Sequence, residues 1–421
     1  MATEPTFEMQ VIETGLTDGY WIQAVDVDGD DRPDLLTSGL SDGRVSWYRN
    51  ADWDKRAIHD FFRPVSLDQG DISGSGRRDL VICHDYARTM FEATPADGKI
   101  SWLQNPGEAG GEWTARFIGQ LGSTHRLRLG HFTDPHTMQL LALPVVGPKS
   151  GMDALHAPIK VMLYDRPDDV LGADCWTGRP VDESSFRVIH AAQLGNFGAP
   201  SPPGLDAMIL ACEEGLVWFG VDETGTWQRH VLHTGETEQE VVTGYKGSGN
   251  VAIGRLGDDS YAYLAAVEPF HGNTLALYTR NDTHDGVVGG TWQRRVLEVF
   301  GEPNDAGEGP AHHVVCADFD GDGEDELLVA LRGPMPHQGV FLYKFSDVRS
   351  GTYQKTRLSE ASAARIAVAD FDGDGRLDFA TLGYYVPGYF LCDDPQLAVF
   401  YNRYGVPMPG APAIPALPLG G

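Results

Sequence analysis

The chain has 421 residues, of which 42% are hydrophobic, and this is enough for a large core. Its formal net charge of −28 argues against nucleic acid and anionic membranes as partners, and no apolar run approaches membrane length. The five cysteines include no C-x-x-C pair, so neither a disulfide scaffold nor a zinc ribbon is indicated. We expect a cytoplasmic protein if Met1 is the native start, and a secreted one if a signal peptide has been removed.

The first predicted strand, residues 7–12, precedes a nine-residue acidic pattern that begins at Asp26 and recurs at Asp318 and Asp370. Each copy places oxygen-bearing side chains at positions 1, 3, 5 and 9, and its glycines permit a tight turn. This alternation suits a hard cation, so we expect structural Ca²⁺ or Mg²⁺. The alternative is that Asp and Gly only cap turns. The expected ligands are Asp26, Asp28, Asp30 and Asp34; Asp318, Asp320, Asp322 and Glu326; and Asp370, Asp372, Asp374 and Asp378.

Weaker copies of this turn begin near residues 71, 131, 196 and 255, which makes seven repeats. Each turn leads into an apolar strand and then into a strand with alternating aromatic residues. The fourth strand of the last repeat is missing after residue 401, and its equivalent stands at the N-terminus. We therefore predict an all-β, seven-bladed β-propeller of four-stranded blades over residues 1–402, closed by residues 7–14. Residues 403–421, rich in Pro and Gly, are predicted to form a tail.

Three histidines occupy one repeat position, six residues before the turn, where the innermost strand of each blade begins. The residues at this position are Tyr20, Val65, His125, His190, Gly249, His312 and Ala364, and the next position adds Trp21, Arg126, His313 and Arg365. Histidines from separate blades at one height can converge on one metal ion or one substrate, and three neutral imidazoles with an open position are typical of catalytic zinc. The alternative is that each histidine only satisfies a backbone carbonyl.

Loops predicted on the same face are polar and aromatic. They contribute His84, Tyr86, His271, Asn273 and Tyr389. Aromatic side chains with hydrogen-bond donors at a tunnel mouth are typical of sugar binding, although the same residues would also serve to pack the rim. A hydrolase is not indicated, because no pair of carboxylates stands out among the residues of the predicted tunnel.

Several longer strings resemble one known family. Gly98-Lys-Ile-Ser-Trp-Leu-Gln-Asn-Pro-Gly107, His125-Arg-Leu, Phe270-His-Gly-Asn-Thr274 and Pro387-Gly-Tyr-Phe390 are similar to the propeller domain of fungal aldos-2-ulose dehydratase, also called 1,5-anhydro-D-fructose dehydratase. The resemblance runs from about residue 18 to residue 401. It implies a seven-bladed propeller and a zinc-assisted elimination of water from a keto-sugar. More distantly, the chain resembles propeller lyases that cleave L-rhamnose-α-1,4-D-glucuronate by β-elimination.

On this resemblance we assign roles to the residues of the predicted tunnel. His125 would abstract the proton, Arg126 would stabilise the developing oxyanion, and Tyr389 would protonate the leaving oxygen. Zn²⁺, with Ca²⁺ as an alternative, would be held by His190, His271 and His312. The expected substrate-binding residues are Tyr20, Trp21, His84, Tyr86, Asn273, His313 and Arg365.

Three functions therefore remain open from the sequence. The first is a metal-dependent carbon–oxygen lyase that dehydrates 1,5-anhydro-D-fructose or a related aldos-2-ulose. The second is a polysaccharide lyase whose substrate is a terminal uronoside, rhamnosyl-glucuronate. The third is a non-catalytic, calcium-binding propeller that serves as a lectin or scaffold.

Overall fold

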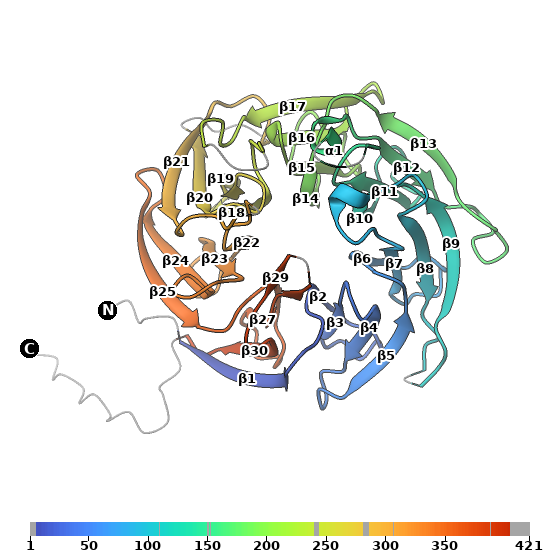
Figure 1. The fold of residues 1–421 in the computed structure, drawn as a ribbon, viewed down its shortest axis with the longest axis horizontal. Helices are drawn as coiled ribbons and strands as arrows, with labels where there is room; N and C mark the ends of the chain where they lie inside the picture. The colour runs from blue at the N-terminus through green and yellow to red at the C-terminus, as the bar shows by residue number, and fades with distance from the viewer. Residues whose placement is uncertain are drawn as a thin grey trace, which may run out of the picture.

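Seven antiparallel, four-stranded sheets stand in a ring around one axis (Figure 1). The structure, a computed structural model, describes residues 6–108, 110–149, 151, 153–239, 244–280, 286–305, 307–387 and 389–404. The first strand of each sheet contacts the first strands of the neighbouring sheets and so lies nearest the axis. The seven-bladed β-propeller predicted from the repeats is confirmed.

The blades follow the chain in order, and within each blade the strands run from the axis outward. They comprise β2 (Trp21–Val25), β3 (Asp34–Ser38), β4 (Arg44–Tyr48) and β5 (Lys55–Asp60); β6 (Ser66–Gly70), β7 (Asp79–His84), β8 (Lys99–Gln104) and β9 (Thr114–Gln120); β10 (Thr124–Gly130), β11 (Gln139–Pro144), β12 (Val161–Asp165) and β13 (Thr177–Asp182); β14 (Ile189–Gly195), β15 (Ala207–Cys212), β16 (Gly215–Val221) and β17 (Trp227–His233); β18 (Asn250–Leu256), β19 (Asp259–Glu268), β20 (Thr274–Arg280) and β21 (Trp292–Val299); β22 (Ala311–Ala317), β23 (Glu326–Leu331), β24 (Gly339–Asp347) and β25 (Thr352–Ser359); and β26 (Arg365–Ala369), β27 (Asp378–Leu382), β30 (Gln396–Asn402) and β1 (Phe7–Thr14).

The N-terminal strand closes the ring as the fourth strand of the last blade. β1 pairs antiparallel with β30, from Phe7 opposite Asn402 to Thr14 opposite Gln396. The predicted tail, residues 403–421, lies outside the described residues except for its first two. The remaining elements are the hairpin β28 (Tyr385–Val386) with β29 (Phe390–Leu391), the helix α1 (Asp153–His156) and the 3₁₀ turn η1 (Met90–Glu92). In the described chain, no helix has the length and apolar character needed to cross a membrane.

The core lies between neighbouring blades, because the middle strands bury both of their faces. Every residue of β11 and β15 is buried, which explains why these strands are continuous apolar runs rather than alternating ones. Trp218 of the fourth blade, for example, shares a cluster with Leu264 and Tyr278 of the fifth. Face-to-face packing of this kind places the seven inner strands at one distance from the axis.

Polar side chains at the acidic turns tie each blade to its neighbour. The ninth residue of the second turn, Asp79, accepts hydrogen bonds from the amides of Ser73 (2.6 Å) and Asn105 (2.8 Å) within its own blade. The Asn105 Nδ2 in turn donates to the carbonyl of Val27 in the preceding blade (2.8 Å). Equivalent bonds run from Asn50 to the carbonyl of Phe371 and from Asn402 to that of Phe319. The turns are therefore inter-blade connections, at the opposite ends of the inner strands from the histidines.

Candidate active site

Three inner strands each carry a histidine where the pairing with the second strand shifts by one residue. Such a β-bulge re-aims the side chain of its extra residue. The extra residues are His125, His190 and His312. Their imidazoles are buried, and the ring centroid of His190 lies 5.1 Å from that of His125 and 5.8 Å from that of His312. The structure thus brings together the histidines that share one repeat position.

Backbone carbonyls of the next blade orient two of these rings. His190 Nδ1 lies 2.6 Å from the carbonyl oxygen of Gly249, and His312 Nδ1 lies 2.5 Å from that of Ala364. Gly249 and Ala364 occupy the same repeat position as the histidines, one blade further on. Because Nδ1 donates to a carbonyl in both residues, Nε2 carries the lone pair. From the sequence, the alternative to metal binding is that each histidine only satisfies a backbone carbonyl. The observed contact is compatible with both, because a metal-bound histidine makes the same contact.

His271 joins this group from the loop after β19, where its backbone φ is +47°. Its Nδ1 lies 2.8 Å from the carboxylate of Glu308, which also accepts from Arg332 at 2.5 Å. Burial alone would raise the pKa of Glu308, but His271 and Arg332 lower it to about 2. A carboxylate behind a histidine fixes the ring and its tautomer. His271 therefore also presents Nε2 to His190.

The three free nitrogens fit a metal ion. His190 Nε2 and His271 Nε2 are 3.0 Å apart, His312 Nε2 is buried without a partner among the described residues, and the three ligand atoms all lie within 4.8 Å of one another. Tetrahedral zinc with bonds of about 2.0–2.1 Å separates its nitrogens by about 3.3 Å. Burial lowers the pKa of all three imidazoles, which keeps them neutral. Arg126 Nη2, 3.3 Å from His190 Nε2, would have to move aside.

His125 stands beside this group but points to a different partner. Its Nε2 lies 2.8 Å from the hydroxyl of Tyr20, and its Nδ1 has no partner in the part of the chain that the structure describes. Burial, together with Arg126, lowers the pKa of His125 well below its usual range. A neutral imidazole next to a metal-binding group is able to accept a proton. Tyr86, whose ring centroid is 6.0 Å from that of His125, covers it on another side.

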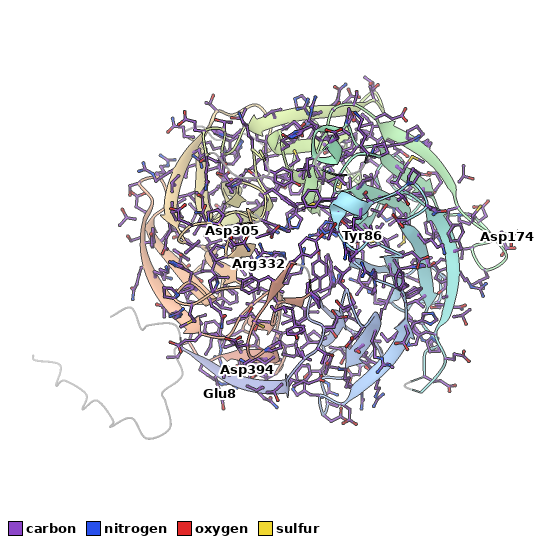
Figure 2. All side chains as sticks on the ribbon, viewed as in Figure 1. Glu8, Tyr86, Asp174, Asp305, Arg332 and Asp394 are labelled. Atoms are coloured by element: carbon purple, nitrogen blue, oxygen red, sulfur yellow. The ribbon has the colours of Figure 1, made fainter. Side chains whose placement is uncertain are left out.

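A small cavity of about 20 Å³ is lined by two of the histidines, His125 and His271. Tyr86 and Arg332 lie on opposite sides of the ring centre in Figure 2. The turn η1 forms part of the cover of this cavity, since the amide of Met90 donates to the Tyr389 hydroxyl (3.0 Å) and the Tyr245 hydroxyl donates to the Met90 sulfur (3.4 Å). This volume holds about one water molecule or ion, whereas ligand pockets have roughly 300–1,000 Å³. A sugar therefore requires movement of this cover. The lining residues are Tyr20, Leu40, Val65, Tyr86, Met90, His125, Val145, Phe270, His271, Tyr384 and Tyr389.

One repeat position further along the inner strands, two arginines lie against one indole. The guanidinium carbons of Arg126 and Arg365 are 5.3 Å and 4.1 Å from the centroid of Trp21. Arg126 also donates to the carbonyl of its neighbour His125 (2.7 Å). His313, predicted here as well, accepts from the amide of Ile366 in the next blade (3.2 Å).

Of the seven residues predicted to bind substrate, only Tyr20 and Tyr86 line the cavity. Trp21, His313 and Arg365 lie one position further along the inner strands, and His84 and Asn273 are absent from the lining as well. His84 lies against the ring of Phe61, and its Nε2 is 2.9 Å from the Ser101 hydroxyl. Asn273 donates to the carbonyl of Gly301 and accepts from Gln239 (3.0 Å). Both side chains make their contacts in the outer parts of the blades, because the ends of the second and third strands lie farther from the axis than the inner strands do. Conversely, four residues of the site were not predicted from the sequence: Met90, Tyr245, Glu308 and Arg332.

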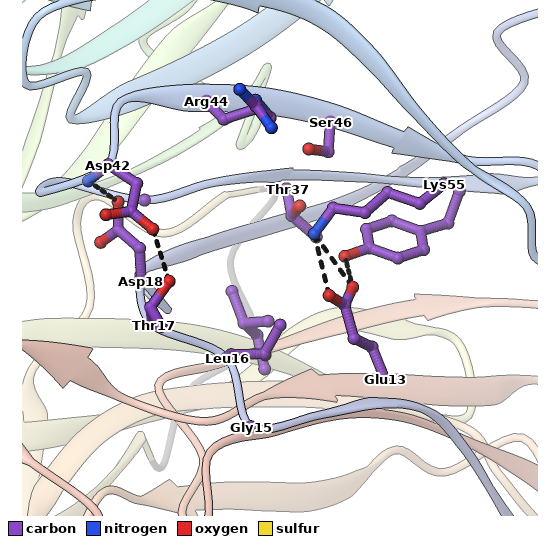
Figure 3. Close-up of a pocket in the computed structure, with 13 residues that line it drawn as sticks. Glu13, Gly15, Leu16, Thr17, Asp18, Thr37, Asp42, Arg44, Ser46 and Lys55 are labelled. Carbon is purple, nitrogen blue, oxygen red and sulfur yellow. Dashed lines mark hydrogen bonds and ion pairs between the residues drawn. The ribbon is translucent and has the colours of Figure 1, made fainter.

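A larger cavity of 430 Å³ lies where the last blade meets the first (Figure 3). Its charged groups are already paired: Glu13 of β1 accepts from Lys55 (3.0 Å) and from the Tyr48 hydroxyl. Across the groove, Thr17 donates to Asp42 (2.5 Å). The lining includes no histidine, and its polar groups serve to join β1 to the first blade. None of the predicted catalytic residues lines this cavity.

The acidic turns form further groups with metal-binding potential. The groups that converge within 4.8 Å are Asp26, Asp28 and Asp34; Asp318, Asp320 and Glu326; and Asp370, Asp372 and Asp374. Basic side chains also reach these turns, and the contacts include Arg49 to Asp28 (2.7 Å), Lys344 to Asp322 (2.9 Å) and Arg403 to Asp372 (2.6 Å). The expected ligands Asp30, Asp322 and Asp378 lie outside these groups. The structural Ca²⁺ or Mg²⁺ expected at the turns remains a proposal.

The fold and the axial histidines define a β-propeller with a candidate catalytic site in its central tunnel. Residues 97–281 match the family model of the aldos-2-ulose dehydratase β-propeller domain, and residues 318–381 match the FG-GAP-like repeat. The chain is 36% identical over 424 residues to the aldos-2-ulose dehydratase of Phanerodontia chrysosporium, in an alignment that covers 95% of this chain and 46% of that protein. The predicted resemblance to the β-propeller domain of aldos-2-ulose dehydratase is confirmed. The chain spans less than half the length of this relative.

Solved structures of other propellers share the fold alone. U3-55K covers 94% of this chain with a TM-score of 0.52 at 8% identity, and 98% of its own chain is aligned. The RRP9 WD40 repeats cover 96% of this chain with a TM-score of 0.52 at 9% identity, and 100% of their own chain is aligned. At such identities these structures say nothing about the chemistry of the tunnel.

Proposed function

We propose that this protein is a metal-assisted carbon–oxygen lyase that removes water from 1,5-anhydro-D-fructose or a related aldos-2-ulose. The observation that carries this proposal is the convergence of His190, His271 and His312 beside a fourth, neutral histidine, His125, where His125 and His271 also line an aromatic cavity. The likeness to a sugar dehydratase over nearly the whole chain supports the substrate class. Zinc bound by the three imidazoles would act as a Lewis acid on the carbonyl oxygen of the sugar.

The reaction breaks a carbon–hydrogen bond next to the carbonyl and a carbon–oxygen bond on the adjacent carbon. His125 takes the proton, since its imidazole is neutral and lies at the cavity wall. The electron pair of that bond becomes the new double bond, and the hydroxyl leaves with a second proton as water. Tyr389 can supply this proton, because its oxygen accepts from Met90 and its own hydrogen remains free to donate. Arg126 would stabilise negative charge on the carbonyl oxygen.

The test is a substrate panel of 1,5-anhydro-D-fructose, glucosone and rhamnosyl-glucuronate, with product absorbance followed with and without a chelator. We expect turnover with a keto-sugar, loss of turnover with chelator, and a decrease of about 10²–10⁴-fold in His125→Ala. The control is His136→Ala, which changes an exposed loop residue. Full turnover in His125→Ala would refute its role as the base. If no compound gives an absorbance rise, the lyase proposal fails and the calcium-binding lectin or scaffold is favoured.

A further inference from the structure

The inner strands contribute seven residues at one level, directly after the histidine position. Strand pairing shows that these seven residues are equivalent. In each blade, the residue lies opposite the fifth residue of the second strand, when counting starts at the ninth position of the turn. We call this set the arginine level. Its members, all of which the structure describes, are Trp21, Ser66, Arg126, Ala191, Asn250, His313 and Arg365.

The arginine level has hydrogen-bond donors without acceptors. Arg365 is 6% exposed, and its Nε and Nη2 are buried with no partner among the described residues. The indole nitrogen of Trp21 and the hydroxyl of Ser66 are buried and unpartnered in the same way. These residues come from consecutive blades, the seventh, first and second, and Arg126 follows in the third. The donors therefore occupy one continuous arc of the ring.

The charge of this arc is also uncompensated. None of the seven residues carries a carboxylate, and both guanidinium groups lie against the same indole. Burial and the neighbouring Arg126 lower the pKa of Arg365 well below its usual range. A guanidinium nevertheless keeps its proton in proteins, and a buried charge requires a partner of opposite sign.

We propose that the arginine level is a binding site for a carboxylate, held in bidentate fashion by Arg365 and bordered by Arg126, Trp21 and Ser66. The unpartnered atoms of Arg365 are Nε and Nη2, whose hydrogens are parallel and match the two oxygens of one carboxylate. The ligand carries acceptors and no donors toward the arc, as a carboxylate does. It is either a free small carboxylate or the carboxylate of a sugar acid that enters the tunnel.

The site does not depend on the proposed lyase activity, and its test uses binding alone. The full chain is first treated with 1,10-phenanthroline and desalted, so that no metal ion can hold the carboxylate. Thermal unfolding is then followed while acetate, D-glucuronate or methyl glucoside is added at ionic strength held constant with chloride. Arg365→Gln and Arg365→Lys are compared with Arg44→Gln, which removes an exposed arginine paired with Asp60.

We expect acetate and glucuronate to raise the unfolding temperature of the parent protein and of Arg44→Gln in a saturable way. Arg365→Gln should weaken this binding about tenfold or more. Arg365→Lys should also weaken it, because lysine keeps the charge but lacks the two parallel N–H donors of the guanidinium group. If Arg365→Gln does not fold, Trp21→Phe, which keeps an aromatic ring and removes the indole N–H, should weaken binding by a smaller factor. Methyl glucoside should give no response that depends on Arg365.

The two sources of carboxylate give different results, and both support the site. Glucuronate that saturates at lower concentration than acetate identifies a sugar acid, whereas equal or weaker binding identifies a free small anion. The proposal is overturned if neither compound binds the parent protein, or if Arg365→Gln binds both as tightly as the parent does. A shift that chloride alone reproduces in every variant also overturns it.

Discussion

Replacing Glu308 by Gln tests whether the histidine group is a metal site or only a packed cluster. Glu308 is not among the residues that line the cavity, and its carboxylate lies 2.8 Å from His271 Nδ1 and 2.5 Å from Arg332 Nη2. In the variant, the amide can accept from one of these partners but presents its own hydrogens to the other. If the cluster binds zinc, the loss of the carboxylate should free the His271 ring and weaken metal binding without removing a ligand.

The contacts of Glu308 determine the expected loss of metal affinity and the expected loss of unfolding free energy in this variant. Loss of a carboxylate behind a ligating histidine lowers metal affinity by about 10–100-fold. The pKa of Glu308, lowered from 4.5 to about 2, corresponds to about 3 kcal/mol of unfolding free energy, and removing one partner of a buried ion pair costs about 3–5 kcal/mol. Because this pKa is depressed, the contribution is complete above pH 4.5 and is lost as the pH falls toward about 2. The parent and the variant should therefore converge in acid.

The assay is competition for Zn²⁺ against a chromophoric chelator, together with urea unfolding of the zinc-free protein. Glu183→Gln is the matched control, because Glu183 is exposed and pairs only with Lys160 at the surface. His190→Ala should abolish binding. A zinc affinity in Glu308→Gln equal to that of the control, with the stability loss intact, would show that Glu308 supports the fold and does not orient a ligand. A parent protein that binds no zinc would refute the metal site itself.

Two further predictions concern the acidic turns. Asn105→Ala should reduce the free energy of unfolding by about 1–3 kcal/mol, since it removes the bond to the buried carbonyl of Val27 and an unsatisfied buried group costs this much. Urea denaturation measures this, and a loss below about 0.5 kcal/mol would contradict the role of the inter-blade bond. Calcium should raise the unfolding temperature more at about pH 7.5 than at about pH 5. Burial raises the pKa of Asp34 to about 6, and this carboxyl group must lose its proton to bind a cation. An equal shift at both pH values, or none, would count against calcium in these turns.

The architecture could be predicted because its markers repeat. The turns at Asp26, Asp318 and Asp370 set a common register, and the unpaired strand at residues 7–12 showed that the ring closes on itself. The same register located His125, His190 and His312, because a ring of equivalent strands places equivalent residues at one height.

The parts of the site that were missed depend on contacts between distant segments. Glu308 meets His271 across two loops, and Met90 meets Tyr389 and Tyr245 from three separate blades, with no shared repeat position to connect them. His84 was predicted from the composition of its loop alone, and it does not line the cavity. Distance from the axis depends on the strand to which a loop belongs, which loop composition does not reveal.

The position of β1 in the last blade has a consequence for the synthesis of the chain. The partner of residue 7, residue 402, leaves the ribosome about 20–80 s after it, at roughly 5–20 residues per second. During that interval β1 cannot join its sheet, although Glu13 can already reach Tyr48 and Lys55 of the first blade. The ring (Figure 1) is therefore completed only after residue 402 has been made, and every earlier intermediate has an open edge.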